Sequence, residues 1–251
     1  MASLQNIVAF LNEELQIEKI PDYDGAMNGL QLENGGDVTK VATAVDASLA
    51  VVEKAVAQGA DLLIVHHGMF WQGARPLTGA FFRKIRTAMD AGLAIYSAHI
   101  PLDVHPLLGN NAVLARELGL NHDGEFFDYK GIKLGVCGDD SRSLGALRDD
   151  LSIVVGGPVL VCGDDSAKVG KVGLVTGGAG SEVEQVAKAG IKTFITGEGP
   201  HWSFPLAEEL GLHVLLAGHY ATETFGVKAL GDLLADNFKI KTIFIDHPSG
   251  L

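Results

Sequence analysis

Residues 62–71 read LLIVHHGMFW, and this stretch decides the fold class. Its four leading apolar residues predict a buried strand of a parallel sheet, and ligands collect at the carboxyl ends of such strands. Because neighbouring side chains on a strand point to opposite faces, His66 and His67 serve one site only if the backbone leaves strand geometry there, which Gly68 permits. The alternative is a histidine pair that caps a turn and packs on Trp71.

The composition is that of a globular protein. The chain has 251 residues, 47% hydrophobic and 20% charged, which is enough for one large or two modest α/β domains. Its formal net charge of −12 argues against nucleic acid as a partner, because binding a phosphate backbone needs clustered lysine and arginine. The two cysteines, Cys137 and Cys162, form no C-x-x-C pair, which argues against both a disulfide framework and zinc binding by thiolates.

Nothing in the sequence indicates export or a membrane. The N-terminal residues 1–15 are amphipathic and acidic, without the cationic start and unbroken apolar core of a signal peptide. No window approaches the roughly 18 uninterrupted apolar residues of a membrane span. We therefore expect a cytoplasmic protein with no membrane partner.

The order of predicted elements is that of an α/β protein. A strand at 41–45, a helix at 47–58 and the strand of the two histidines form a βαβ unit, which requires a right-handed crossover. A helix near 79–91, a strand at 93–97 and a helix over 109–119 follow. The first half of the chain therefore predicts a parallel sheet with covering helices.

The second half repeats this order. Setting residues 40–71 over 171–202 without a gap gives eight identities in 32 positions, and Trp71 falls on Trp202, the only other tryptophan. The match resumes further on, with 91–99 over 211–219 at an offset of 120.

We interpret this match as an internal duplication of a β-α-β-α-β-α unit. The first copy covers residues 1–127 and the second covers 128–251, entered through strands near 132–136 and 159–161. The predicted fold class is α/β, with two similar three-layer α/β/α domains. An arrangement in which the two domains interlink is one option. A coincidental match between two periodic α/β sequences is the alternative.

Polar side chains stand at equivalent strand ends in the two copies. His66 and His67 end the second strand of copy one, and Gly197-Glu198, followed by His201, ends that strand in copy two. After the third strand each copy has a histidine and, four residues later, a carboxylate; these are His99 with Asp103 and His219 with Glu223. If the two copies face each other, nitrogen and oxygen ligands converge from both.

Imidazole and carboxylate without sulfur suit Zn, Fe, Mn, Co or Ni better than Mg or Ca alone. Three or more histidines with two carboxylates can hold two metal ions about 3.5–4 Å apart and lower the pKa of a bridging water toward neutrality. The alternatives are a helix-dipole role for Glu223, a turn role for Asp103, and for His99 a role in orienting a ligand through its ring N–H.

A glycine-rich run, TGGAG at 176–180, follows a predicted strand. Its amides could cradle a phosphate, although it lacks the Gly-Lys-Ser/Thr ending of a P-loop. A tight turn between strand and helix is the interpretation that we favour.

Five segments together resemble the NIF3-like family, also called DUF34 and often labelled GTP cyclohydrolase 1 type 2 homologues. They span nearly the whole chain in order: NGLQ at 28–31, VHHGMFW at 65–71, HIPLDVHP at 99–106 with the following GNN, TGEGPHW at 196–202 and GHYATETFG at 218–226. The length resembles that of the short bacterial form. The resemblance implies two similar α/β domains and a ring-like homohexamer whose sites face an internal cavity.

The resemblance also implies a dinuclear metal site. Its ligands would be His66, His67, Asp103, His219 and Glu223. Glu223 would bridge two ions, with His67 and Asp103 on one and His66 and His219 on the other. It implies no secure substrate.

Two classes of function fit these residues. The first is a metal-dependent hydrolase that acts on a small molecule, namely a nucleotide, a phosphoester or a cyclic amide. Glu198 and His201 would act there as general acid–base groups or as supports of the ligands. The second is a non-enzymatic metal-binding assembly factor, chaperone or oligomeric adaptor, motivated by the absence of a substrate-selective motif.

Overall fold

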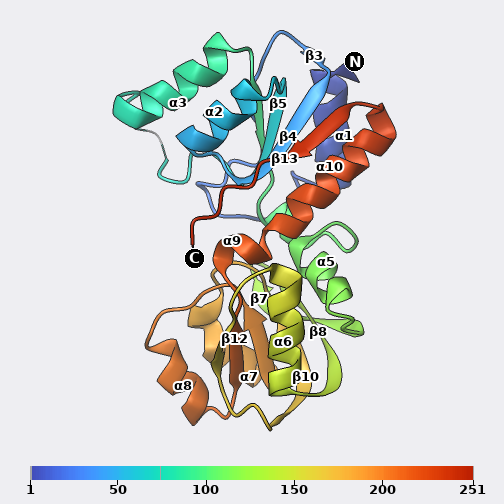
Figure 1. The fold of residues 1–251 in the computed structure, drawn as a ribbon, viewed down its shortest axis with the longest axis vertical. Coiled ribbons are helices and arrows are strands. Elements are labelled where there is room, and N and C mark those ends of the chain that lie inside the picture. The colour runs from blue at the N-terminus through green and yellow to red at the C-terminus, as the bar shows by residue number, and fades with distance from the viewer. Residues whose placement is uncertain (1, 74, 251) are drawn as a thin grey trace. The chain divides into compact units, whose positions relative to one another are not determined.

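The computed structural model describes residues 2–73 and 75–250, and its contacts divide the chain into two compact units (Figure 1). The first unit comprises Met1–Leu102 and Gly226–His247, and the second comprises Asp103–Phe225 with Pro248–Leu251. The C-terminal helix and strand thus belong to the first unit. Our division of the sequence at 127/128 concerns the repeat, and it stays a prediction.

The first unit is built on a five-stranded sheet in the order β13-β4-β5-β6-β2. Strands β13, β4, β5 and β6 run parallel, and β2 pairs antiparallel with β6. The bounds are β2 Gly29–Leu32, β4 Lys40–Asp46, β5 Leu62–His67, β6 Ala94–Ser97 and β13 Lys241–Phe244. A separate antiparallel pair joins β1 (Ala2–Ser3) to β3 (Asp37–Val38).

Helices cover both faces of this sheet. Alternate residues of β4 face opposite layers, as the pleat of a strand requires. Ala42 and Ala44 belong to a core with residues of α2 (Leu49–Ala57) and α3 (Gly79–Asp90). On the other face, Thr43 lies against Gly231 of α10 (Thr224–Phe238), and Tyr96 of β6 donates a hydrogen bond to Asn12 of α1 (Leu4–Glu14). The unit therefore has three layers.

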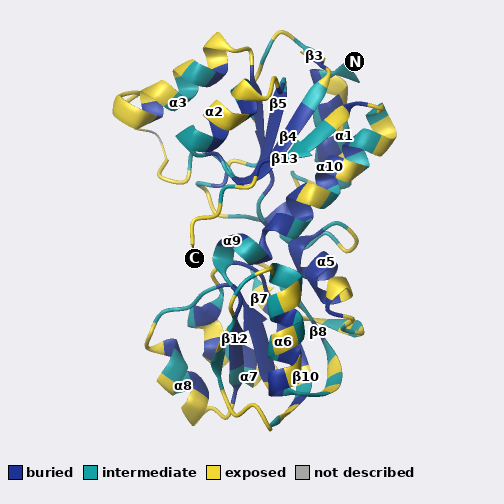
Figure 2. Ribbon diagram, viewed as in Figure 1, coloured by how far each residue is buried: buried dark blue, intermediate teal, exposed yellow. Residues whose placement is uncertain are grey.

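The second unit has a six-stranded sheet in the order β7-β8-β10-β11-β12-β9. Strands β10, β11 and β12 run parallel, and the remaining pairs are antiparallel. The bounds are β7 His122–Tyr129, β8 Ile132–Ser143, β9 Leu160–Cys162, β10 Lys168–Leu174, β11 Thr193–Thr196 and β12 His213–Leu216. Figure 2 shows the central strands of both sheets as buried.

Two cores flank the second sheet. One joins α5 (Asn110–Glu117) and α6 (Leu144–Val155) to strand residues such as Ile195, and the other joins α7 (Val183–Lys188) and α8 (Ser203–Glu209) to strand residues such as Phe194. Short helices complete the chain: α4 Ile100–Asp103, η1 Gly180–Glu182 and α9 His219–Thr222. The predicted α/β class with covered parallel strands is confirmed.

Strand pairing corrects the alignment of the two halves by one residue. Leu62 pairs with Ala94 in the first sheet, and Thr193, the counterpart of Leu62 in the repeat, pairs with His213 in the second. Ala94 therefore corresponds to His213 at an offset of 119, whereas our ungapped comparison used 120. The register fixes the equivalence because paired residues share a level in the sheet. His219, the first residue of α9, thus corresponds to the first residue of α4 and not to His99.

Across residues 2–73 and 75–250, none of the helices combines the length and the apolar character that crossing a lipid bilayer requires.

Candidate metal centre

The two adjacent histidines lie at the carboxyl end of β5, inside the strand. We expected the backbone to leave strand geometry there, and this was wrong: β5 extends through His67, which still pairs with Asp46 of β4. The rings of His66 and His67 nevertheless lie 4.8 Å apart between centroids. Side chains on a strand lean along the strand direction, so both rings extend past the end of β5. The two faces of the sheet meet at that edge, which brings the rings together.

Three histidines of the first unit, His66, His67 and His99, share one pattern of hydrogen bonding. In each of them Nδ1 meets a carbonyl or carboxylate oxygen, which can only accept, so Nδ1 carries a hydrogen; in the neutral imidazole Nε2 is then the nitrogen with the lone pair that binds a metal ion. The pairs are His66 with Ala98 O at 2.9 Å, His67 with Asp46 Oδ1 at 2.9 Å, and His99 with Asp22 Oδ1 at 2.8 Å. The candidate ligand atoms of His66, His67 and His99 all lie within 4.8 Å of one another.

Asp22 was missed by sequence reasoning, although it lies in the loop before NGLQ. Its carboxylate accepts hydrogen bonds from the Tyr23 and Ile100 amides at 2.6 and 2.9 Å and from Asn28 Nδ2 at 2.8 Å, besides the contact with His99. Burial raises the pKa of Asp22, but the hydrogen bond and charge of His99, together with the hydrogen bonds from Asn28 and the Tyr23 amide, outweigh burial and lower the pKa below the ordinary value. Asp22 is thus a charged anchor for the His99 ring.

Gly68 serves a purpose other than backbone freedom. A Cβ at this position would collide with the side chain of Gln31. Gln31 donates to the carbonyls of Ala26 and Met27 at 3.1 and 3.0 Å and accepts from the Met69 amide at 2.7 Å. The absent side chain of Gly68 therefore lets Gln31 tie the loop before β2 to the loop after β5.

In the second unit, His219 lies between two carboxylates. Its Nδ1 contacts Glu198 Oε1 at 2.9 Å, and its Nε2 contacts Glu223 Oε2 at 3.2 Å. Burial lowers the pKa of His219, but the hydrogen bonds and charges of Glu223 and Glu198 outweigh burial and raise the pKa to about 9. Glu198 thus orients the His219 ring here, and the general acid–base role that we assigned to Glu198 stays a prediction.

The glycine-rich run packs against these side chains. Gly177 has φ +70°, and a Cβ there would collide with Glu223 Oε1, while a Cβ at Gly178 would lie 3.4 Å from His219 Cε1. The Gly177, Ala179 and Gly180 amides donate to acceptors of the protein itself, namely Thr222 Oγ1, Thr196 Oγ1 and the Glu198 carbonyl. These amides are therefore committed to the turn, and they do not form the phosphate cradle that was our alternative.

Asp103, at the end of α4, is held by the helix that follows it. Asn110 Nδ2 donates to Asp103 Oδ1 at 2.8 Å, and Asn111 Nδ2 donates to the Asp103 carbonyl at 3.3 Å and to the Leu134 carbonyl at 2.7 Å. Asn111 Oδ1 also accepts from the Thr176 amide at 2.8 Å. Both asparagines are buried, so the GNN segment fixes the Asp103 side chain.

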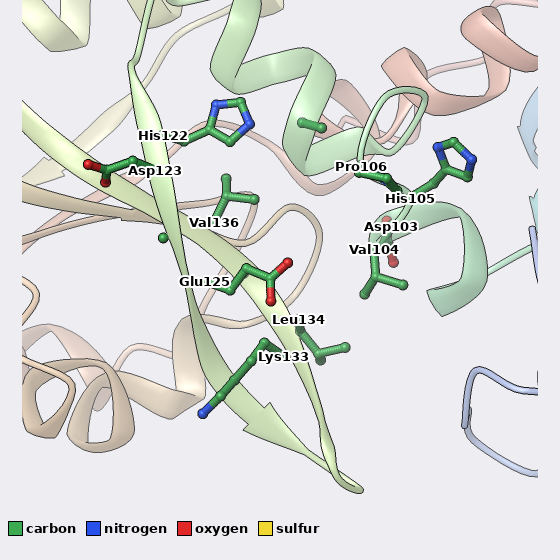
Figure 3. Close-up of a pocket in the computed structure, with 13 residues that line it drawn as sticks. Asp103, Val104, His105, Pro106, His122, Asp123, Glu125, Lys133, Leu134 and Val136 are labelled. Carbon is green, nitrogen blue, oxygen red and sulfur yellow. The ribbon is translucent and has the colours of Figure 1, made fainter.

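Asp103 also lines a hollow of about 590 Å³ in the second unit (Figure 3). Its opposite wall is the β7–β8 hairpin, which contributes Asp123, Glu125 and Lys133. His201, by contrast, is exposed in the turn before α8, and in the described part of the chain no hydrogen bond or ring contact joins its side chain to His219. The catalytic role that we assigned to His201 stays a prediction.

Comparison with known proteins extends over nearly the whole chain. The family model Duf34/NIF3 (NGG1p interacting factor 3) matches residues 2–249. A GTP cyclohydrolase 1 type 2 homolog of Deinococcus radiodurans is 40% identical over 247 residues, which cover 98% of this chain and 93% of that protein. The structure of protein ybgI, described as of unknown function, is 37% identical with a TM-score of 0.91 and covers 99% of this chain and all of its own. TTHA1606 from Thermus thermophilus is 39% identical with a TM-score of 0.85, over 99% of this chain and 100% of that one.

Proposed function

Because the chain belongs to the Duf34/NIF3 family, we propose that it is a metal-dependent hydrolase with a dinuclear centre. The proposed ligands are His66 and His67 from the first unit and Asp103, His219 and Glu223 from the second. The substrate is a nucleotide, a phosphoester or a cyclic amide; the name of the Deinococcus relative favours the nucleotide, by similarity alone.

The observation that carries this proposal is the common orientation of the histidines. A ligating histidine usually donates its other ring N–H to a carboxylate or carbonyl, which fixes the ring and its tautomer. His66 and His67 both do so through Nδ1, with Ala98 O and Asp46 as acceptors. A histidine that merely filled the core would need no such uniform placement of its lone pair.

The donor set fits divalent transition metals. Imidazole nitrogen and carboxylate oxygen without thiolate suit Zn, Fe, Mn, Co or Ni, so either of the two ions could be any of these. Two such ions, when bound, act as Lewis acids and lower the pKa of water toward neutrality. The protein's own part is to hold His219 by Glu198, Asp103 by Asn110 and His99 by Asp22 in fixed orientations.

Metal analysis tests the proposal. Protein purified without oxygen is loaded with each metal in turn, and its bound metal is counted for the natural chain, His67→Ala, Glu223→Gln and the control His247→Ala. We expect two ions per chain in the natural protein and the control, and at least one ion fewer in both ligand variants. The loaded protein is then incubated with a cell-metabolite extract and depleted species are identified by mass spectrometry.

Full metal loading in His67→Ala and Glu223→Gln would contradict the metal centre. A natural protein that holds two ions and yet depletes no nucleotide, phosphoester or cyclic amide would contradict the hydrolase and leave a metal-binding protein.

We also propose, from the family resemblance, that the protein assembles into a ring-like homohexamer in the cytoplasm. Light scattering on the eluting protein measures the mass directly. A mass of six chains supports the proposal, and a monomer or dimer at all concentrations contradicts it.

A further inference from the structure

Large apolar side chains are exposed beside the histidines of the first unit. Tyr23 is 52% exposed and Trp71 36%. We call these two residues the aromatic rim. Single exposed apolar residues are ordinary, but a group of them next to candidate ligands indicates a binding surface.

Backbone contacts position the two loops that bear the aromatic rim. Asp22 accepts a hydrogen bond from the Tyr23 amide and also holds His99, so Tyr23 is tied to the histidine cluster. The loop that bears Tyr23 touches the loop that bears Trp71: a Cβ at Gly25 would come within 2.6 Å of the Trp71 carbonyl oxygen. Preorganised side chains bind with a smaller loss of conformational entropy than mobile ones.

The indole of Trp71 lies against three rings of the first unit, and it stacks parallel to none of them. Its centroid is 4.6 Å from that of His99 and 5.6 Å from that of His67, at interplanar angles of 85° and 71°. Tyr23 lies 6.4 Å from Trp71 at 55°. In the described part of the chain these are the ring contacts of Trp71, and none of them is a parallel stack.

We propose that Tyr23 and Trp71 form a stacking subsite for a planar nitrogen heterocycle, such as a nucleobase or a pteridine. This inference rests on the proposed function, because it selects a class among the substrates proposed above. A flat ring stacked on Trp71 would lie near His67, a proposed metal ligand whose ring centroid is 5.6 Å from that of the indole. Aromatic side chains stack on heterocycles of any identity because every such ring has a π-face.

The fluorescence of Trp71 can report ligand binding at the stacking subsite. The chain has two tryptophans, so Trp202→Phe leaves Trp71 as the only one. In that background the indole fluorescence is titrated with guanosine, adenosine and uridine, and with ribose and inorganic phosphate as non-planar controls, in metal-free and metal-loaded protein. We expect saturable quenching by the nucleosides and none by ribose or phosphate.

Three further variants locate the binding. Tyr23→Leu is expected to weaken nucleoside binding about tenfold, and Trp71→Leu, followed by calorimetry, to weaken it at least as much. Phe82→Leu removes an aromatic ring exposed on α3 and is expected to change nothing. Metal content is measured on every variant, so a lost metal centre is not mistaken for a lost subsite.

The inference is overturned if no nucleoside quenches Trp71 saturably, or if Trp71→Leu binds nucleosides as well as the natural chain. It is also overturned if Tyr23→Lys lowers the oligomeric mass, since the aromatic rim would then be a contact between copies. If the protein binds nucleosides but is shown to hold no metal, the stacking subsite is supported. The proposed metal-dependent function is then refuted.

Discussion

The corresponding parallel strands of the two sheets, β5 and β11, differ in the side chains at their carboxyl ends. In the first unit β5 ends in His66 and His67, whereas in the second β11 ends at Thr196 and is followed by Gly197 and Glu198. The topology around both strand ends is alike, with parallel neighbours on either side. The difference teaches that one arrangement of strands can present nitrogen donors in one unit and a carboxylate that orients a histidine in the other.

The largest expected effect is the loss of metal affinity on removing one proposed ligand from either unit. His66→Ala and Glu223→Gln are each expected to lower metal affinity more than 100-fold, because a ligand atom is lost outright and outer partners alone are worth about 10–100-fold. Equilibrium dialysis against a competing chelator measures this, with His247→Ala as the control. Equal affinity in either variant would show that the residue replaced is not a metal ligand.

The orienting carboxylates should matter less than the ligands and comparably in the two units. Asp46→Asn removes the charge that meets His67, and Glu198→Gln removes the charge that meets His219. Each is expected to weaken metal binding about 10–100-fold while leaving the ligand itself in place. The same dialysis ranks them, and an effect of Glu198→Gln as large as that of Glu223→Gln would make Glu198 a ligand.

The turn under Glu223 should tolerate no side chain. Gly177→Ala places a Cβ against Glu223 Oε1 at φ +70°, and we expect a loss of about 1–3 kcal/mol in the free energy of unfolding together with weaker metal binding. Gly190→Ala is the matched control, because Gly190 has φ +77° with open space around it. It should cost stability without changing metal affinity. If both variants bind metal equally well, the contact between Gly177 and Glu223 is unimportant.

The smallest expected effect is on the pH dependence of the metal-free protein. The pKa of His219 rises on folding from 6.5 to about 9, so its contribution to stability is complete below pH 6.5 and is lost as the pH rises through about 9. We expect the free energy of unfolding to fall by an amount on the order of 2 kcal/mol over that window. Denaturant titrations at several pH values measure it, and in His219→Gln that part of the slope should disappear. An unchanged slope would contradict the pairing of His219 with the two glutamates.

Sequence patterns predicted the parallel strands well because their apolar runs are short and sharply bounded. The strand predicted at 41–45 is β4, Lys40–Asp46, and the helix predicted near 79–91 is α3, Gly79–Asp90. The histidines at the end of β5 were identifiable because burying a polar side chain beside an apolar strand costs free energy unless the side chain has a hydrogen-bond partner or a ligand.

The partners of these histidines could not be predicted in the same way. Asp22, Asp46 and Ala98 lie far from one another in sequence and meet His99, His67 and His66 only once the sheet has formed. The one-residue error in the second offset has a similar origin, since hydrophobic periodicity does not fix the register between strands that long loops connect. The role of Gly68 as space for Gln31 likewise depends on a contact across 37 residues.

The central proposal is that His66, His67, Asp103, His219 and Glu223 hold two metal ions. Anomalous X-ray diffraction from crystals of the loaded protein, recorded at the absorption edge of the metal, tests it most directly. We predict two anomalous peaks per chain, with Nε2 of His66 and of His67 bound to different ions and Glu223 bound to both. A single peak, peaks away from these residues, or a metal ion bound through Nδ1 of either histidine would contradict it.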